Sequence, residues 1–237
     1  MKTLFAVFAF ALLAATMVAA PLPSAADEIS SVVRGGLLYD KWYKVKGVDA
    51  PKMGQPSYPK DNKYYGKKGE DWRCKNCHGW DYMGKDGAYK KGSHATGIAG
   101  IRGAAGADVA KVGAILKDAT HAYGDKLSAK DLADLALFVS KGQVDMDRYI
   151  DRAAKKAKGD AGKGAKYYNT LCANCHGFDG KKVEDMDPVG KLVGKNPWEI
   201  MHKLLNGQPA ENMPSLRALD MQVTVDILAY SATLPKK

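Results

Sequence analysis

Cys172-Ala173-Asn174-Cys175-His176 is the stretch that decides the fold, and Cys74-Lys75-Asn76-Cys77-His78 repeats its pattern earlier in the chain. Each is a C-x-x-C-H run, and the two runs hold all four cysteines of the 237 residues. Two thiols at this spacing can bond to the vinyl groups of one haem, and the histidine that follows reaches the iron. The pattern predicts two covalently bound c-type haems. Their attachment residues would be Cys74, Cys77, Cys172 and Cys175, with His78 and His176 as iron ligands.

Two other uses of the same pattern fit the spacing less well. A structural zinc site needs a second C-x-x-C about 15–20 residues further on, whereas Cys77 and Cys172 are 95 positions apart. A thioredoxin-like dithiol has one motif in a βαβ context, and these two motifs lie in sequence rich in glycine and lysine. Covalent haem is therefore preferred over zinc and over a redox dithiol.

The first 26 residues have the pattern of a secretory signal peptide. Lys2 precedes an apolar run from Leu4 to Ala20, and a small-residue cleavage site ends at Ala26. The alternative is an uncleaved membrane anchor, for which about 20 apolar residues would be needed. We expect cleavage before Asp27 and a periplasmic or otherwise exported protein, with membrane association left open.

The chain is basic, with 36 Lys and Arg against 26 Asp and Glu and a formal net charge of +10. A basic exported protein can meet nucleic acid, anionic lipid or an acidic protein surface. No nucleic-acid-binding motif is present, so we expect no nucleic acid partner. The lysines either form a solvated face or steer the protein towards redox proteins with acidic docking surfaces.

The rest of the chain is predicted to be all-α, with no convincing strand. Apolar periodicity and capping residues indicate helices over 27–46, 107–117, 128–141, 159–171, 196–206 and 220–233. Loops are expected over 47–69, 79–106 and 181–194, and the second half of the connector could form a helical turn or two. Because the order of helices, haem motif and loops occurs twice, we expect two tandem domains. These are 27–142, with an insertion at about 47–69, and 159–237, joined by a linker at 143–158.

The second unit resembles the class I cytochrome c family over about 159–235. Gly164 and Tyr168 stand eight and four residues before Cys172, Ile227-Leu228-Ala229-Tyr230 lies in the last helix, and Met213 is followed by Pro214. In addition, Pro188 stands twelve residues after His176. The family's features occur here in the family's order.

The resemblance implies how these residues act. Gly164 and Tyr168 would lie where the first and last helices cross, and Met213 would bind the iron opposite His176. The carbonyl of Pro188 would accept a hydrogen bond from Nδ1 of His176, which orients the ring and raises its basicity. Methionine is an established axial haem ligand.

The first unit departs from the family pattern. Gly35 and Tyr39 keep the spacing of four but lie far before Cys74, and residue 90, twelve after His78, is lysine. The closing helices still align, because Asp134-Leu135-Ala136-Leu137-Phe138 overlays Asp226-Ile227-Leu228-Ala229-Tyr230 at an offset of 92. The same offset carries Met213 to His121, which we expect as the distal ligand of the first haem. His94 and an open iron position remain as alternatives, and His202 is expected to be exposed.

Two six-coordinate haems suit electron transfer better than substrate binding. Methionine ligation raises the haem potential relative to a second imidazole, so an electron would enter at the first haem and leave from the second. We therefore expect an electron carrier between redox proteins rather than an enzyme. Two alternatives are kept: a dihaem oxidoreductase, for example acting on sulfur compounds, with substrate at the first haem, and a subunit of a larger redox assembly.

Overall fold

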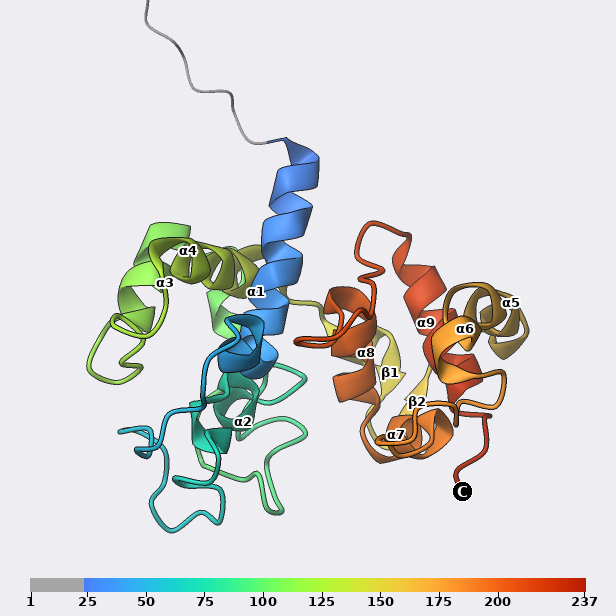
Figure 1. The fold of residues 1–237 in the computed structure, drawn as a ribbon, viewed down its shortest axis with the longest axis horizontal. Helices are drawn as coiled ribbons and strands as arrows, with labels where there is room; N and C mark the ends of the chain where they lie inside the picture. The colour runs from blue at the N-terminus through green and yellow to red at the C-terminus, as the bar shows by residue number, and fades with distance from the viewer. Residues whose placement is uncertain (1–23) are drawn as a thin grey trace, which may run out of the picture.

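The computed structural model describes residues 24–237, in which two groups of helices lie side by side (Figure 1). Residues 24–142 are called the amino-terminal half, 143–158 the connector and 159–237 the carboxy-terminal half. Almost all of the expected signal peptide, up to residue 23, lies outside the described residues. No helix in the described part is both long enough and apolar enough to cross a membrane.

The amino-terminal half is built on one long helix. It contains α1 (Ala25–Val45), α2 (Cys74–His78), α3 (Val109–Leu116) and α4 (Ala129–Leu137), with short 3₁₀ turns at Glu70–Trp72 and Arg102–Ala104. Ser24 and Asp27 form a capping box at the start of α1, which satisfies backbone N–H groups that the helix leaves free. α1 packs against α4, and α4 packs against α3. A wide turn, Phe138–Gly142, extends α4, so this element covers the predicted 128–141.

Glycine permits the crossing of α1 and α4. A Cβ atom at Gly35 would overlap the carbonyl oxygen of Asp134 and would lie 2.5 Å from Cβ of Phe138. Real side chains do not approach this closely, so any larger residue would push the helices apart. Tyr39, one turn further along α1, is buried against the ring of Phe138, with 5.4 Å between the ring centroids.

The carboxy-terminal half contains α5 (Ala161–Leu171), α6 (Ala173–His176), α7 (Val189–Lys195), α8 (Pro197–Asn206) and α9 (Met221–Ser231). α5 packs against α9, as α1 does against α4. The prediction of a loop over 181–194 was wrong in its second part, where α7 forms. Glycine lowers helix propensity there, but Gly190 lets the helix pack against the backbone of Leu234, and Val193 is buried.

The second half of the connector forms a small hairpin instead of helical turns, so that prediction was wrong; the first half contains a 3₁₀ turn, Met146–Arg148. Strands β1 (Ile150–Asp151) and β2 (Lys156–Ala157) pair antiparallel, with Ile150 opposite Ala157. Ile150 is buried, and the guanidinium of Arg152 binds carboxylates outside the hairpin. These tertiary contacts outweigh the local helix propensity of the alanines and lysines in this segment.

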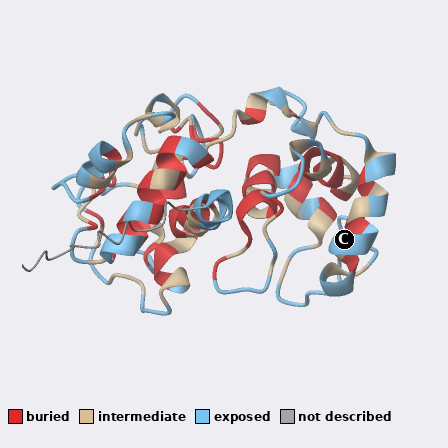
Figure 2. Ribbon diagram, turned by 90° about the horizontal axis from the view of Figure 1, so that it is seen from above, coloured by how far each residue is buried: buried red, intermediate tan, exposed pale blue. Residues whose placement is uncertain are grey.

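Helix α8 packs against helices of both halves. It packs against α7 and α9 of its own half and also against α1 of the other. Buried residues lie along the inward faces of the helices, and exposed ones gather in the outer loops (Figure 2). The expectation that His202 is exposed was wrong: it is only 1% exposed, because α1 covers the face of α8 from which it projects.

Candidate haem-attachment sites

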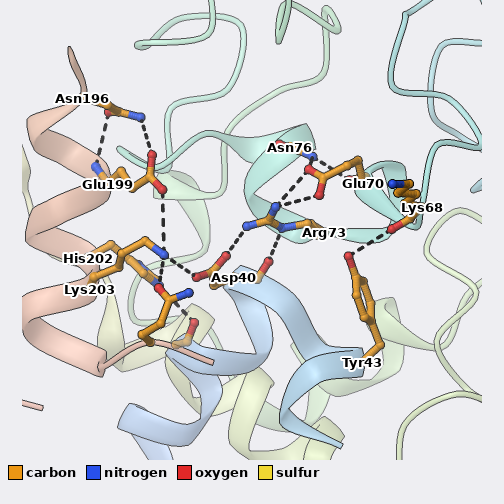
Figure 3. A network of polar contacts seen from close by, with 12 residues as sticks. Asp40, Tyr43, Lys68, Glu70, Arg73, Asn76, Asn196, Glu199, His202 and Lys203 are labelled. Carbon is orange, nitrogen blue, oxygen red and sulfur yellow. Dashed lines mark hydrogen bonds and ion pairs between the residues drawn. The ribbon is translucent and has the colours of Figure 1, made fainter. Parts of the chain in front are cut away.

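A polar network holds the first C-x-x-C-H helix against α1 (Figure 3). Arg73, at the start of α2, donates from Nε to the carbonyl of Asp40 (2.8 Å) and from its guanidinium to the carboxylates of Asp40 and Glu70. Burial opposes ionisation of Asp40, but Lys203 and Arg73 outweigh it and lower the pKa of that carboxyl to about 2. Asp40 therefore stays charged and binds α2 on one side and α8 on the other.

The two motif helices end in the same backbone geometry. Gly79 follows α2 at φ 79° and ψ 159°, and Gly177 follows α6 at φ 78° and ψ 157°. Positive φ of this kind is accessible to glycine at little cost. The hydroxyl of Tyr39 donates to the carbonyl of Gly79 (2.6 Å), and that of Tyr168 donates to the carbonyl of Gly177 (3.0 Å). The turn after each motif histidine is thus held by a tyrosine from a preceding long helix.

His78 has its ring oriented by a backbone carbonyl. Its Nδ1 lies 2.7 Å from the carbonyl oxygen of Ala99, and since a carbonyl only accepts, Nδ1 carries the hydrogen. Nε2 is then the atom with a free lone pair, which is the arrangement that a metal-binding imidazole needs. The sequence offered no signal for Ala99, because every residue has a carbonyl and the usual proline is absent at position 90.

His121 faces His78. The two ring centroids are 6.3 Å apart and the ring planes differ by 26°. Two imidazoles that bind one metal from opposite sides, each through a bond of about 2 Å, have centroids about 6 Å apart. The Nδ1 atom of His121 lies 3.1 Å from a carboxylate oxygen of Asp118, which also accepts the backbone N–H of His121. The residues present therefore fit a haem iron held between the two histidines.

His94 lies in a different environment. Its ring is stacked between Tyr64 and Tyr89, with centroid distances of 4.5 and 4.8 Å and interplanar angles of 15°. Burial lowers its pKa to about 4. The stacking of Tyr64 on His94 connects the irregular 47–69 segment to the loop over 79–106. Asn62 adds a second connection between them, because its side chain donates to the carbonyl of Ser93. The ring of His94 is thus stacked between two tyrosines, whereas the ring of His121 lies near that of His78. Which of the two binds iron stays a prediction.

The second motif lacks the bond expected at its histidine. Nδ1 of His176 is buried and has no hydrogen-bond partner. The carbonyl of Pro188 instead accepts the backbone N–H groups of Lys191 (2.9 Å) and Leu192 (3.1 Å), because Pro188 caps helix α7. The predicted bond between Pro188 and His176 is therefore not formed. The loop that was expected there would have left this carbonyl free.

Met213 lies in the loop between α8 and α9. Its side chain is partly buried against the core, and its carbonyl oxygen lies over Gly207, where a Cβ atom would approach it to 2.7 Å. Gly207 has φ 86° and ends α8, so the chain turns back sharply at that residue. The role of Met213 as an iron ligand stays a prediction.

The environments of Cys74, Cys77 and Cys172 suit uncharged sulfur. Burial raises the pKa of Cys74 to about 11, of Cys77 to about 12 and of Cys172 to about 11. All four cysteines are free of disulfides. Zinc binding and thiol exchange use the thiolate, which these surroundings disfavour, whereas a thioether bond to haem carries no charge. Within residues 24–237 no three His, Cys, Asp or Glu side chains gather as a metal site.

The carboxy-terminal half is thus a helical domain packed around a C-x-x-C-H turn. Residues 159–230 match the family model described as "Cytochrome C oxidase, cbb3-type, subunit III". This region is a c-type cytochrome domain, an electron-transfer unit with covalently bound haem iron. The matched residues include the second motif and Met213 but none of the amino-terminal half. No curated protein matches the chain.

Proposed function

We propose that the protein is an exported dihaem c-type cytochrome that transfers electrons between redox partners. The observation that carries the proposal is the facing pair of His78 and His121 beside the first C-x-x-C-H helix, outside the region of the family match. An electron carrier needs each iron fully ligated by the protein. The distance between the ring centroids of that pair is suited to two imidazoles that bind one metal.

Repeated contacts support a second cytochrome c domain over residues 27–142, with 47–69 as an insertion and 143–158 as a linker. A Cβ atom at Gly35 would overlap the carbonyl oxygen of Asp134, and one at Gly164 would overlap that of Asp226. Asp134 and Asp226 are related by the offset of 92 that also relates His121 to Met213. The same helix crossing therefore stands beside both haem motifs.

The chain's own residues would hold and orient the two haems. When bound, each haem iron takes up and releases a single electron. His78 and His121 would ligate the first iron, and His176 and Met213 the second. Methionine raises the potential relative to a second imidazole, so electrons would move from the first site to the second. Full ligation keeps substrates off both irons.

The expected location and partners follow from charge and from the amino-terminal segment. Covalent haem attachment and the predicted signal peptide of residues 1–26 both favour a periplasmic or otherwise exported protein. The net charge of +10 favours partners with acidic docking surfaces. Such docking would be weak and transient, as is usual for electron-transfer encounters.

The number of haems is tested by mass spectrometry of the purified protein. We expect the mass of the chain from Asp27 plus two haems. A double Cys74→Ala, Cys77→Ala variant should keep one haem, and so should the corresponding variant of Cys172 and Cys175. Bare polypeptide, or a single haem in the unmutated protein, would refute the dihaem proposal.

The ligands are tested by magnetic circular dichroism in the near infrared, which reports the axial pair of each ferric haem. We expect one bis-histidine signal and one histidine–methionine signal. Two identical signals would refute the assignment of His121 or of Met213. Variants at those two positions would then show which assignment failed.

A second candidate function comes from the family description, which names an oxidase subunit. The protein would then be a subunit of a larger redox assembly, and the mass of the native particle tests this. A substrate-binding oxidoreductase has less support. The cavity of about 450 Å³ in the amino-terminal half is lined by residues from 59–63 and 92–96, none of them in a haem motif. Rapid carbon monoxide binding to one reduced haem would favour that alternative.

A further inference from the structure

Three consecutive residues after the first haem motif are contacted by side chains of the connector and of helix α8. The ammonium of Lys203 lies over the ring of Trp80, 5.5 Å from its centroid. The guanidinium of Arg152 binds the carboxylate of Asp81 at 2.6 Å. The hydroxyl of Tyr82 lies 2.9 Å from Nδ1 of His202. The turn that follows His78 and Gly79 is therefore shaped by the connector and by α8.

His202 makes the most specific of these contacts. Its Nε2 lies 3.0 Å from the carbonyl oxygen of Gly36 in α1, and a carbonyl only accepts, so Nε2 carries the hydrogen. Nδ1 is then an acceptor and receives the hydroxyl hydrogen of Tyr82. Burial lowers the pKa of His202 to about 4, against the opposing effect of nearby Asp40. The neutral ring therefore links α1 and Tyr82 at neutral pH.

Tyr82 is held in an unusual backbone conformation. Its φ is 63°, a region that residues with a side chain rarely adopt, and its side chain is completely buried. Its carbonyl accepts the backbone N–H groups of Ile101 (2.8 Å) and Arg102 (3.2 Å). Such a conformation persists only where surrounding contacts enforce it, and the hydrogen bond to His202 is one of those contacts.

The backbone near Tyr82 is in contact with the segment that carries the Ala99 carbonyl, which accepts the hydrogen bond from His78. Gly84 pairs with Ala99 in an antiparallel bridge, and the N–H of Lys85 donates to the carbonyl of Ile98 (2.8 Å). A Cβ atom at Gly100 would overlap the carbonyl of Tyr82. Residues 82–85 and 98–100 are thus in contact on both sides of Ala99, whose carbonyl orients His78.

We propose that His202 is a positioning residue for the haem site in the other half. It acts through Tyr82 to keep the Ala99 carbonyl on Nδ1 of His78. The proposal rests on the first haem being present, as proposed above. A hydrogen bond at Nδ1 makes the imidazole a more basic ligand, which favours ferric iron and lowers the potential. Loosening that bond would therefore raise the potential of the first haem.

A second, separate contact keeps the halves together when His202 is changed. Lys203 of α8 binds the carboxylate of Asp40 in α1 at 3.2 Å, and Asp40 also binds Arg73 (Figure 3). Gly36 and Asn206 add a close approach between the same two helices. Substitution of His202 therefore alters the link to Tyr82 while the docking of α8 on α1 has other support.

The test is the midpoint potential of each haem, measured by spectroelectrochemistry of the full dihaem protein. His202→Leu and Tyr82→Phe should each raise the midpoint of the bis-histidine haem and leave the other unchanged. Loss of such an outer hydrogen bond typically costs about 10–100-fold in metal affinity or activity. A tenfold change in the ferric-to-ferrous ratio corresponds to about 59 mV for one electron. His202→Gln, which can both donate and accept, should restore most of the wild-type value. Thr224→Val is the matched control, because it removes a buried hydroxyl in α9 that has no hydrogen-bond partner among the described residues, and it should change neither midpoint.

Unchanged midpoints in both His202→Leu and Tyr82→Phe would overturn the proposal. So would a His202→Gln protein that shifts as far as His202→Leu. If His202→Leu does not fold, Tyr82→Phe alone decides, because it removes a single hydroxyl. A wild-type protein with one haem and one redox transition would refute the dihaem function instead, so the two failures are distinguishable.

Discussion

Substitution of Gly35 tests whether α1 and α4 cross as a haem-domain helix pair. In Gly35→Ala the added methyl group would lie 2.5 Å from Cβ of Phe138 and 2.8 Å from the carbonyl carbon of Asp134, and it would overlap the carbonyl oxygen. Two of these three neighbours are backbone atoms in the middle of a helix. They cannot move without displacing α4 as a whole.

The expected cost follows from two opposing effects. Overpacking of a well-packed core typically costs about 1–3 kcal/mol, and fixed backbone neighbours place this site at the upper end. Replacing glycine by alanine inside a helix returns up to about 1 kcal/mol. The net loss should therefore be about 2 kcal/mol. For a chain of this size that corresponds to a fall in Tm of about 4–8 °C.

The assay is thermal and denaturant unfolding, followed by far-ultraviolet circular dichroism. Gly113→Ala in α3 is the matched control, because the nearest atom to its added Cβ is 4.0 Å away. That variant should be neutral or slightly more stable than wild type. If Gly35→Ala and Gly113→Ala unfold at the same midpoint, α1 and α4 do not cross closely at Gly35 in solution, and the reasoning fails.

Four further predictions concern single residues. Burial lowers the pKa of His202 from 6.5 to about 4. Between these two pH values His202 is therefore protonated in the unfolded chain but neutral in the folded protein. This should remove about 3 kcal/mol of unfolding free energy between pH 6.5 and 4, and urea titrations of His202→Gln should lack that contribution. Arg34→Met should cost about 2 kcal/mol in denaturant unfolding, since it removes one ion-pair partner from each of two buried aspartates, which keep Lys46 and Lys130. His121→Ala should change the low-spin spectrum of one haem, whereas His94→Ala should leave both unchanged; the reverse result would assign the ligand to His94. Met213→Ala should lower the higher of the two midpoint potentials, and an unchanged value would exclude Met213 as a ligand.

The helix predictions from sequence were accurate where the signal was local. The apolar spacing and capping residues of α1, α4, α5, α8 and α9 are properties of short segments, and the structure has a helix at each. Predictions failed where distant contacts decide the conformation. α7 depends on Gly190 packing against Leu234, and the connector hairpin depends on Arg152 reaching Asp81.

The contacts of the candidate haem ligands also divide into those that the sequence predicted and those that depend on tertiary structure. An offset of 92 between the closing helices singled out His121, and the structure brings its ring opposite His78. Nothing in the sequence pointed to Ala99, because the acceptor is a backbone carbonyl and every residue carries one. The family pattern predicted the carbonyl of Pro188 for His176, but helix α7 uses that carbonyl for its own N–H groups.

By itself the sequence predicts where haem can be attached, because a thioether bond and its neighbouring histidine depend on residue types within five consecutive positions. It also predicted most of the helices in their order, since their periodicity is local, but it missed α7. Only the tertiary structure decided that α8 lies against α1, that His202 is buried, and that the turn after His78 is held from the other half. Those features depend on which apolar helix faces pack together. Because many faces are similar in sequence, packing of the whole chain determines which of them meet.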